Sequence, residues 1–365
     1  MKLVAFAGVM AFAINAPVIV APATDAYLSM SFGLTRPELA KLHEGHAVVR
    51  SLASADPREI SSLGVIMVDA TPEDYIEQLR DIAGFKRGDS VTQIGTFGAQ
   101  PAVRDIAQLT LPSGDRRHLA KCRRGRCDVQ LPADAMERIF RSVEWSTHLE
   151  ADQADSAFRG ELVRIATNYL ELGEAGMPVY HDEPVTTSTA VEFRGMVWDE
   201  PALLRDFDSL SEHLRRFPRR TAGVEDLLYW SREKVGRAEV ISITHLAIQA
   251  IPDRTPIAFI AASRQVYSTH YFDASLGITL LLSEPTTAGS TVVVYANRSR
   301  ADVFGGLLGP MKRSIAANRS RAAIGKFLTA VREKVESRVE HDDACADVAR
   351  APLDTLARPY STNRQ

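Results

Sequence analysis

The sequence predicts an α+β protein in which a curved antiparallel sheet grips a long C-terminal helix. Short runs rich in β-branched residues lie near both ends of the chain, at 47–97 and 238–297. A mostly helical segment, about 101–235, separates these regions, and one amphipathic pattern covers 303–339. Because a sheet with an apolar face needs a cover, we expect the final helix to pack on it.

The first elements expected are a hairpin followed by a helix. The apolar runs 47–52 and 60–68 predict two strands. Thr71 is a suitable helix cap, Pro72 fits the first helical position, and two acids follow in the first turn. A further short strand is expected at 91–97.

The middle segment and the C-terminal region differ in their periodicity. Apolar residues at helical spacing predict helices at 163–170 and at 223–234, which reads GVEDLLYWSREK. After Gly236, turn residues separate short β-prone runs, which favours antiparallel hairpins. The strands expected there are 240–251, 257–272, 278–283 and 291–297.

The composition excludes several classes of protein. The chain has 365 residues, of which 45% are hydrophobic and 24% charged, with a formal net charge of −3. A disordered or collagen-like chain is excluded, and the near-neutral charge argues against a nucleic-acid partner. Residues 296–340 are more basic, with ten Lys or Arg residues against four acids. This run is either the solvated face of a helix or a surface for peripheral contact with an anionic membrane.

The two chain ends are expected to lie outside the folded domain. Residues 1–23 begin with Lys2, continue with an apolar run and end in small residues, which is typical of a signal peptide. The alternative is a retained membrane anchor. Residues 24–46 are expected to form a leader with one short helix, and 341–365 a disordered tail. The mature protein is therefore expected outside the cytoplasm, in the periplasm.

Two of the three cysteines are close in sequence. Cys122 and Cys127 enclose four residues and are expected to form a disulfide in an oxidising compartment. The alternatives are a zinc half-site, which lacks a second pair of ligands, and a redox pair, which more often has C-x-x-C spacing. Cys345 is left over in the polar tail and is expected to be free.

The order of the predicted elements resembles the helix-grip fold of START-type (SRPBCC-like) lipid-transfer domains. The resemblance covers 47–97 and 238–340, and it implies one domain over 47–340 with the helical insertion inside it. It also implies a cavity for an apolar or lipid-like ligand between the sheet and the last helix. The runs GVEDLLYWSREK, VISITHL and YSTHYFDASLG are similar to an uncharacterised group of secreted bacterial proteins, which implies no activity.

The densest polar cluster is 263–273. If it is one strand, alternate residues share a face, so Arg264, Ser268 and His270 lie on one side, and Gln265, Tyr267, Tyr271 and Asp273 on the other. One face then lines a ligand cavity, or it is simply solvated. The candidate ligand-binding residues are Tyr229, Trp230, His245, Arg264, Tyr267, His270, Tyr271 and Asp273.

The main expectation is a non-catalytic protein that binds an apolar or lipid-like small molecule. An extracytoplasmic, hydrolase-like enzyme using the segment Tyr267–Asp273 is an alternative, although the chain has no G-x-S-x-G elbow. A structural envelope protein without a small ligand is another. No cofactor and no metal is expected, since the nine histidines are scattered and neither H-E-x-x-H nor a phosphate-binding glycine loop occurs.

Overall fold

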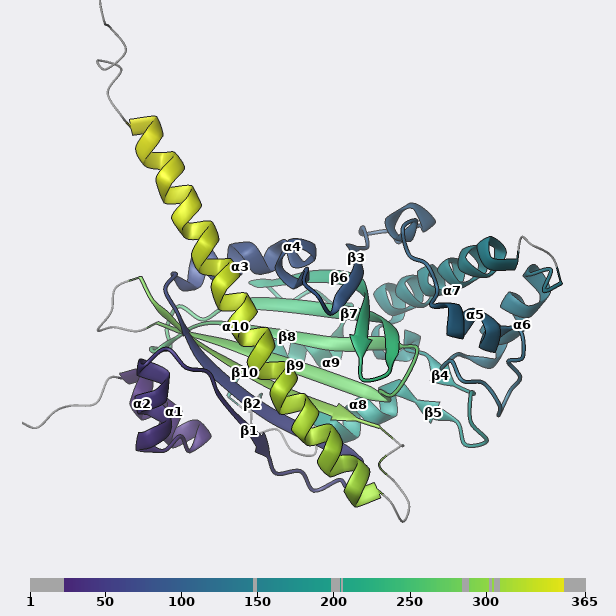
Figure 1. Ribbon diagram of the computed structural model, residues 1–365, viewed down its shortest axis with the longest axis horizontal. Helices are drawn as coiled ribbons and strands as arrows, with labels where there is room; N and C mark the ends of the chain where they lie inside the picture. Colours follow the sequence, from purple (N-terminus) through teal and green to yellow (C-terminus); the bar gives the residue numbers. More distant parts are fainter. Residues whose placement is uncertain are drawn as a thin grey trace, which may run out of the picture.

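The computed structural model has the predicted α+β architecture. It describes residues 23–146, 150–197, 204, 206–283, 289–301, 304 and 309–350, with side chains up to His341. Within these residues, a large antiparallel sheet carries a long C-terminal helix, and a mostly helical segment joins the two halves of the sheet (Figure 1). This arrangement is compatible with a helix-grip fold.

Eight strands form the sheet in the order β1-β2-β10-β9-β8-β7-β6-β3, with β1 and β3 at its open edges. Strands from the two ends of the chain therefore lie side by side, and β2 pairs with β10 along its whole length. The strands are β1 (Val48–Leu52), β2 (Glu59–Val68), β3 (Val91–Thr96), β6 (Val224–Val235), β7 (Ala238–Ala250), β8 (Ile257–Ser268), β9 (Ala274–Ser283) and β10 (Thr291–Arg300). A separate ribbon contains β4 (Val179–Tyr180) and β5 (Thr187–Ser188).

Helices cover both sides of the sheet (Figure 1). The grip side carries α10 with α3 and α4, and the insertion side carries the helices of the middle segment together with α1 and α2. The helices are α1 (Ala23–Phe32), α2 (Arg36–His43), α3 (Pro72–Arg80), α4 (Ile82–Lys86), α5 (Ser113–Leu119), α6 (Ala133–Ser142), α7 (Glu150–Leu172), α8 (Thr189–Val197), α9 (Asp208–Arg216) and α10 (Gly309–Arg350).

Helix α10 packs closely against β2 and is hydrogen-bonded to α4. Gly64 of β2 lets the helix approach, because a Cβ atom there would lie 2.6 Å from side-chain atoms of both Ile324 and Leu328. Lys334 donates hydrogen bonds to two carbonyl groups at the end of α4, at 2.9 and 3.0 Å. These carbonyls have no partner within their own helix, so Lys334 fixes α4 to α10.

The start of α3 confirms the predicted cap. Thr71 Oγ accepts a hydrogen bond from the Asp74 backbone N–H at 3.1 Å, and the Asp74 carboxylate accepts one from the Thr71 backbone N–H at 3.0 Å. Pro72 is the first helical residue. Two donors at the helix start are thereby satisfied reciprocally.

The prediction of a helix at 223–234 is wrong, because this segment forms β6. Leu228, Tyr229 and Trp230 are all buried, since both sides of this strand are covered. A strand covered on both sides loses the alternation of apolar and polar residues that identifies a strand in a sequence. The helical middle segment therefore ends with α9, and β6 belongs to the sheet.

Other boundaries also differ from the predictions. β8 ends at Ser268, and Tyr271 has a φ of 68°, so the chain turns before β9. The leader contains two helices instead of one. Helix α10 begins at Gly309 and continues to Arg350, so the first part of the predicted disordered tail is helical. No proline occurs between Pro310 and Pro352 to end the helix earlier.

The loop between α5 and α6 contains the predicted disulfide, between Cys122 and Cys127. The side chain of Cys345 lies outside the described part of the chain, as do residues 1–22 of the predicted signal peptide. Among the helices that the structure describes, none combines the length and the apolar character needed to cross a bilayer.

Candidate functional site

The grip side of the sheet is apolar at one end. Leu246 of β7, Leu281 of β9 and Val293 of β10 pack with Tyr75 of α3 and Leu328 of α10. All five side chains are buried. This end of the sheet is a closed core that holds α10 and α3 in place.

The other end of the same side is polar. The pairing register places Ser263 and Gln265 of β8, Ser275 and Thr279 of β9, and Asn297 of β10 in one patch, which we call the polar floor. All of these side chains are half-buried. Ser263, Gln265 and Thr279 make no side-chain hydrogen bond to another residue in the described stretches, so their polar groups are available to a ligand or to water.

Neighbouring side chains orient part of the polar floor. Ser299 donates a hydrogen bond to Asn297 Oδ1 at 2.9 Å, and the hydroxyl groups of Ser275 and Ser299 lie 2.8 Å apart. Gly277 leaves room for the phenol of Tyr295, because a Cβ atom there would lie 3.0 Å from its hydroxyl oxygen. The Asn297 amide is therefore held in a defined direction beside an aromatic ring.

An ion pair lies where the polar floor meets α4. Lys86 Nζ is 2.6 Å from Glu233 Oε1, which also accepts a hydrogen bond from Ser231 at 2.6 Å. Burial disfavours both charges, but the attraction between them is stronger, so the pKa of Lys86 is raised and the pKa of Glu233 is lowered. Both side chains are therefore charged at neutral pH, and Lys86 also lies over the Tyr229 ring at 5.4 Å.

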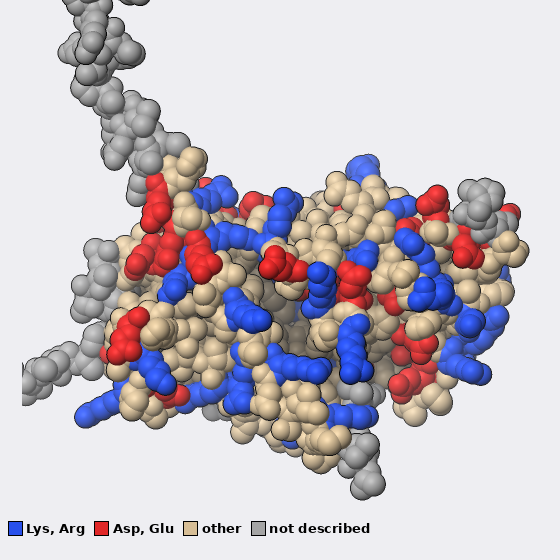
Figure 2. Space-filling model, in the orientation of Figure 1, with Lys and Arg blue, Asp and Glu red and all other residues tan. Residues whose placement is uncertain are grey.

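The surface of the grip side is hollowed beside α10, and Lys and Arg side chains gather around this hollow (Figure 2). The first part of α10, 309–331, contains five Lys or Arg residues and no acid. Ser320 of this part lies 3.3 Å from Ser62 of β2, hydroxyl to hydroxyl, so it runs beside the polar end of the sheet. The hollow therefore has a polar floor and a basic helix at its side.

Of the predicted ligand-binding residues in the sheet, only Tyr229 lies on the grip side. Trp230 and Tyr267 belong to the core of the insertion side, where the Trp230 indole donates to the Asp105 carbonyl at 2.9 Å. Arg264 is also on that side, in an ion pair with Glu174 at 2.9 Å. These polar atoms are used by the fold of the middle segment.

The predicted residues after β8 do not share a strand face. His270 Nε2 lies 3.0 Å from the Asp115 carboxylate of α5, and Asp273 is buried with its carboxylate 3.4 Å from Gln130 Nε2. Tyr271 is 40% exposed in the turn. The expectation that Arg264 and His270 lie on one strand face is wrong, because the strand ends before His270.

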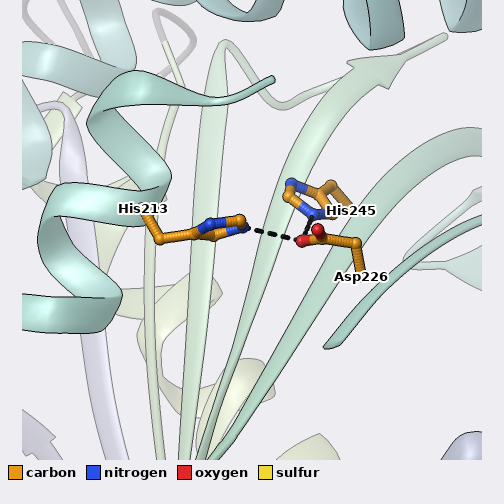
Figure 3. A group of neighbouring side chains, drawn as sticks. All are labelled: His213, Asp226 and His245. Carbon is orange, nitrogen blue, oxygen red and sulfur yellow. Dashed lines mark hydrogen bonds and ion pairs between the residues drawn. The ribbon is translucent and has the colours of Figure 1, made fainter. Parts of the chain in front are cut away.

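The insertion side contains a cluster that the sequence analysis missed, formed by His213 of α9, Asp226 of β6 and His245 of β7 (Figure 3). We call it the His–Asp–His cluster. Asp226 Oδ1 lies 2.7 Å from His213 Nε2 and 2.8 Å from His245 Nε2. Because a carboxylate oxygen only accepts, both rings donate from Nε2. His245 Nδ1 then accepts from the Tyr169 hydroxyl at 2.7 Å.

The electrostatics of the His–Asp–His cluster follow from its burial. Burial opposes the charge on Asp226, but hydrogen bonds from His213 and His245 outweigh it and hold the pKa of Asp226 well below its usual range. Burial also lowers the pKa of His245, which Asp226 offsets only in part. Burial raises the pKa of Tyr169 to about 12, so its hydroxyl keeps the proton that it donates. The cluster is an ionised carboxylate between two imidazoles.

A separate open pocket of about 430 Å³ lies near the far end of α10, between the start of α3 and Arg338. Asp74, which lines it, is engaged in capping α3. This pocket is distinct from the polar floor.

The signal for the His–Asp–His cluster is present in the sequence once the β6–β7 hairpin is recognised. Leu228 pairs with His245, so Asp226, two residues earlier, is a diagonal neighbour of His245 on the same face. His213 has no comparable local signal. No protein-family model matches the chain, and no curated protein is significantly similar to it in sequence.

Proposed function

We propose that this protein is an extracytoplasmic binding protein that holds a lipid-like small molecule between the sheet and α10, as START-type domains do. The observation that carries the proposal is the division of the grip side into an apolar end and a half-buried polar floor. A polar head group would meet the polar floor, and an apolar chain would lie against the half-buried rings of Tyr295 and Phe327 beside it, since the apolar end itself is closed. The disulfide supports the extracytoplasmic location.

The charges beside the hollow favour an anionic head group. The first part of α10 carries only basic charges, whereas the charge of Lys86 at the edge of the polar floor is balanced by Glu233, 2.6 Å away. Gln265 and Ser263 supply neutral hydrogen-bonding groups that have no partner among the described residues. A carboxylate or phosphate ester head group would bind there through charge and hydrogen bonds together.

Titration with a fluorescent fatty acid, dansyl-undecanoic acid, tests this proposal. We expect saturable binding to one site, and weaker binding of the corresponding uncharged methyl amide. The variant Ser263→Trp places an indole on the polar floor and should reduce the affinity by at least about tenfold.

The matched control is Ser283→Trp, the same substitution at the exposed end of β9, which should bind the probe as the wild type does. Circular dichroism establishes that both variants are folded. The proposal fails if the folded wild type shows no saturable binding, or if Ser263→Trp and Ser283→Trp bind the probe equally well.

A further inference from the structure

The His–Asp–His cluster lies on the insertion side, away from the proposed ligand hollow. We propose that His213, Asp226 and His245 bind a divalent transition-metal ion of the zinc type, through Nε2 of each imidazole and one carboxylate oxygen. This site is independent of the proposed ligand-binding function, because its residues project from the opposite side of the sheet.

The three donor atoms are already close to the arrangement that a metal requires. They lie within 4.8 Å of one another, and the two nitrogen–oxygen distances are 2.7 and 2.8 Å. Ligands bound tetrahedrally to zinc at about 2.0–2.2 Å lie roughly 3.4 Å apart. Small side-chain rotations would therefore open space for the ion between the three ligand atoms. Binding requires each Nε2 to lose the proton that it donates to Asp226, either to Nδ1 of the same ring or to solvent.

The fold supports each ligand. Asp226 and His245 are on adjacent, hydrogen-bonded strands, and His213 is in the last turn of α9, close to the ring of Phe217. The Tyr169 hydroxyl contacts the second nitrogen of His245, at 2.7 Å. With Nε2 bound to the metal, Nδ1 would carry the proton and donate to the Tyr169 hydroxyl oxygen, and such a hydrogen bond fixes the ring orientation.

The surrounding charges permit a cation. The buried guanidinium of Arg264 lies 5.7 Å from the centre of the Tyr169 ring, and its ion pair with Glu174 at 2.9 Å balances its charge. The Asp226 carboxylate supplies a negative charge at the site itself. The side chain of Asp226 is 17% exposed, whereas His213 and His245 are closed from solvent, so an ion would enter past Asp226.

The ligand set indicates the class of metal. Two imidazoles and one carboxylate suit first-row divalent ions such as Zn²⁺, and they are a poor match for Mg²⁺ or Ca²⁺, which prefer oxygen ligands. Three protein ligands leave a fourth position for water or another small molecule. This position would face the solvent beside Asp226.

Metal titration of chelator-treated, full-length protein tests the proposal. We expect one equivalent of Zn²⁺ to bind by calorimetry, and Co²⁺ to give the visible absorption of a low-symmetry site with nitrogen ligands. Asp226→Ala and His245→Asn should each weaken Zn²⁺ binding by about 100-fold or more. The control His270→Asn removes the histidine of the His270–Asp115 pair, where no third ligand converges among the described residues, and should bind as the wild type does.

Two results would overturn the assignment. One is a folded wild-type protein that binds neither Zn²⁺ nor Co²⁺. This result can be obtained without any variant. The other is a Zn²⁺ affinity that survives in Asp226→Ala and is lost in His270→Asn.

Discussion

Arg264 and Gln265 are neighbours in β8 and project to opposite sides of the sheet. Arg264 is fully buried on the insertion side, where it contacts Glu174, the Leu214 carbonyl and the Phe193 ring. Gln265 is half-buried on the grip side and makes no side-chain hydrogen bond within the described residues. The polar groups of Arg264 therefore serve the fold, whereas those of Gln265 can serve a ligand.

The largest expected difference in the free energy of unfolding is between variants of Arg264 and Gln265. Arg264→Met removes the ion pair with Glu174, the hydrogen bond to the Leu214 carbonyl and the contact with the Phe193 ring, and should lower the free energy of unfolding by about 4 kcal/mol. Glu174 keeps an ion pair with Arg194, at 3.3 Å. Gln265→Met removes no hydrogen bond to a described residue and should cost less than about 1 kcal/mol. Urea denaturation measures both. Equal losses would show that the two sides do not differ as proposed.

The next effect concerns the apolar end of the grip side. Leu328 is fully buried against β2, so Leu328→Ala should lower the free energy of unfolding by about 3 kcal/mol through lost burial and a cavity. Met311→Ala, on an exposed part of the same helix, should change it by less than about 0.5 kcal/mol. If both variants unfold at the same urea concentration, α10 is not held by this core.

A smaller, pH-dependent effect is expected from Lys86 and Glu233. Because the folded-state pKa of Glu233 is lowered, the pair stabilises the protein above the unfolded pKa of a glutamate, about 4.3. The advantage of wild type over Glu233→Gln should be about 1–2 kcal/mol at pH 7 and should shrink as the pH falls below about 4. A difference that grows on acidification would contradict the assigned charges.

The smallest stability effect is expected at Tyr169. Tyr169→Phe keeps the aromatic stack on Phe217 and removes the hydroxyl that contacts His245, so it should cost about 1 kcal/mol. Zn²⁺ affinity should nevertheless fall by about 10–100-fold, because the imidazole is no longer oriented. Unchanged affinity would remove Tyr169 from the metal site and leave it a packing residue.

Local signals in the sequence predict most of the fold. The cap at Thr71 and the β-branched runs after Gly236 give the correct elements, because capping and strand formation depend on adjacent residues. The prediction of a helix at 223–234 is wrong for the opposite reason, because both sides of β6 are covered by elements distant in the sequence. The contact between Asp226 and His245 could not be predicted either, because it depends on the register of the β6–β7 hairpin.

The polar floor was only partly predictable. The polar character of 263–273 is evident in the sequence, but the direction of each side chain depends on a shift of register between Ile243 and Thr244 and on the turn at Tyr271. The predicted ligand-binding residues Arg264 and Tyr267 therefore lie on the insertion side. Thr279 and Asn297 were not predicted as candidate ligand-binding residues. The role of an isolated polar residue in an apolar strand can be predicted only from its neighbours across the sheet.

Photo-crosslinking with a fatty acid that carries a diazirine near the end of its chain tests the central claim most directly. After irradiation and digestion, peptide mapping identifies the side chains that contact the bound ligand. The proposed function predicts adducts in β8, β9, β10 and α10, competed by unlabelled fatty acid and reduced in Ser263→Trp. Adducts confined to the middle segment, or no competed adducts at all, would contradict a ligand held between the sheet and α10.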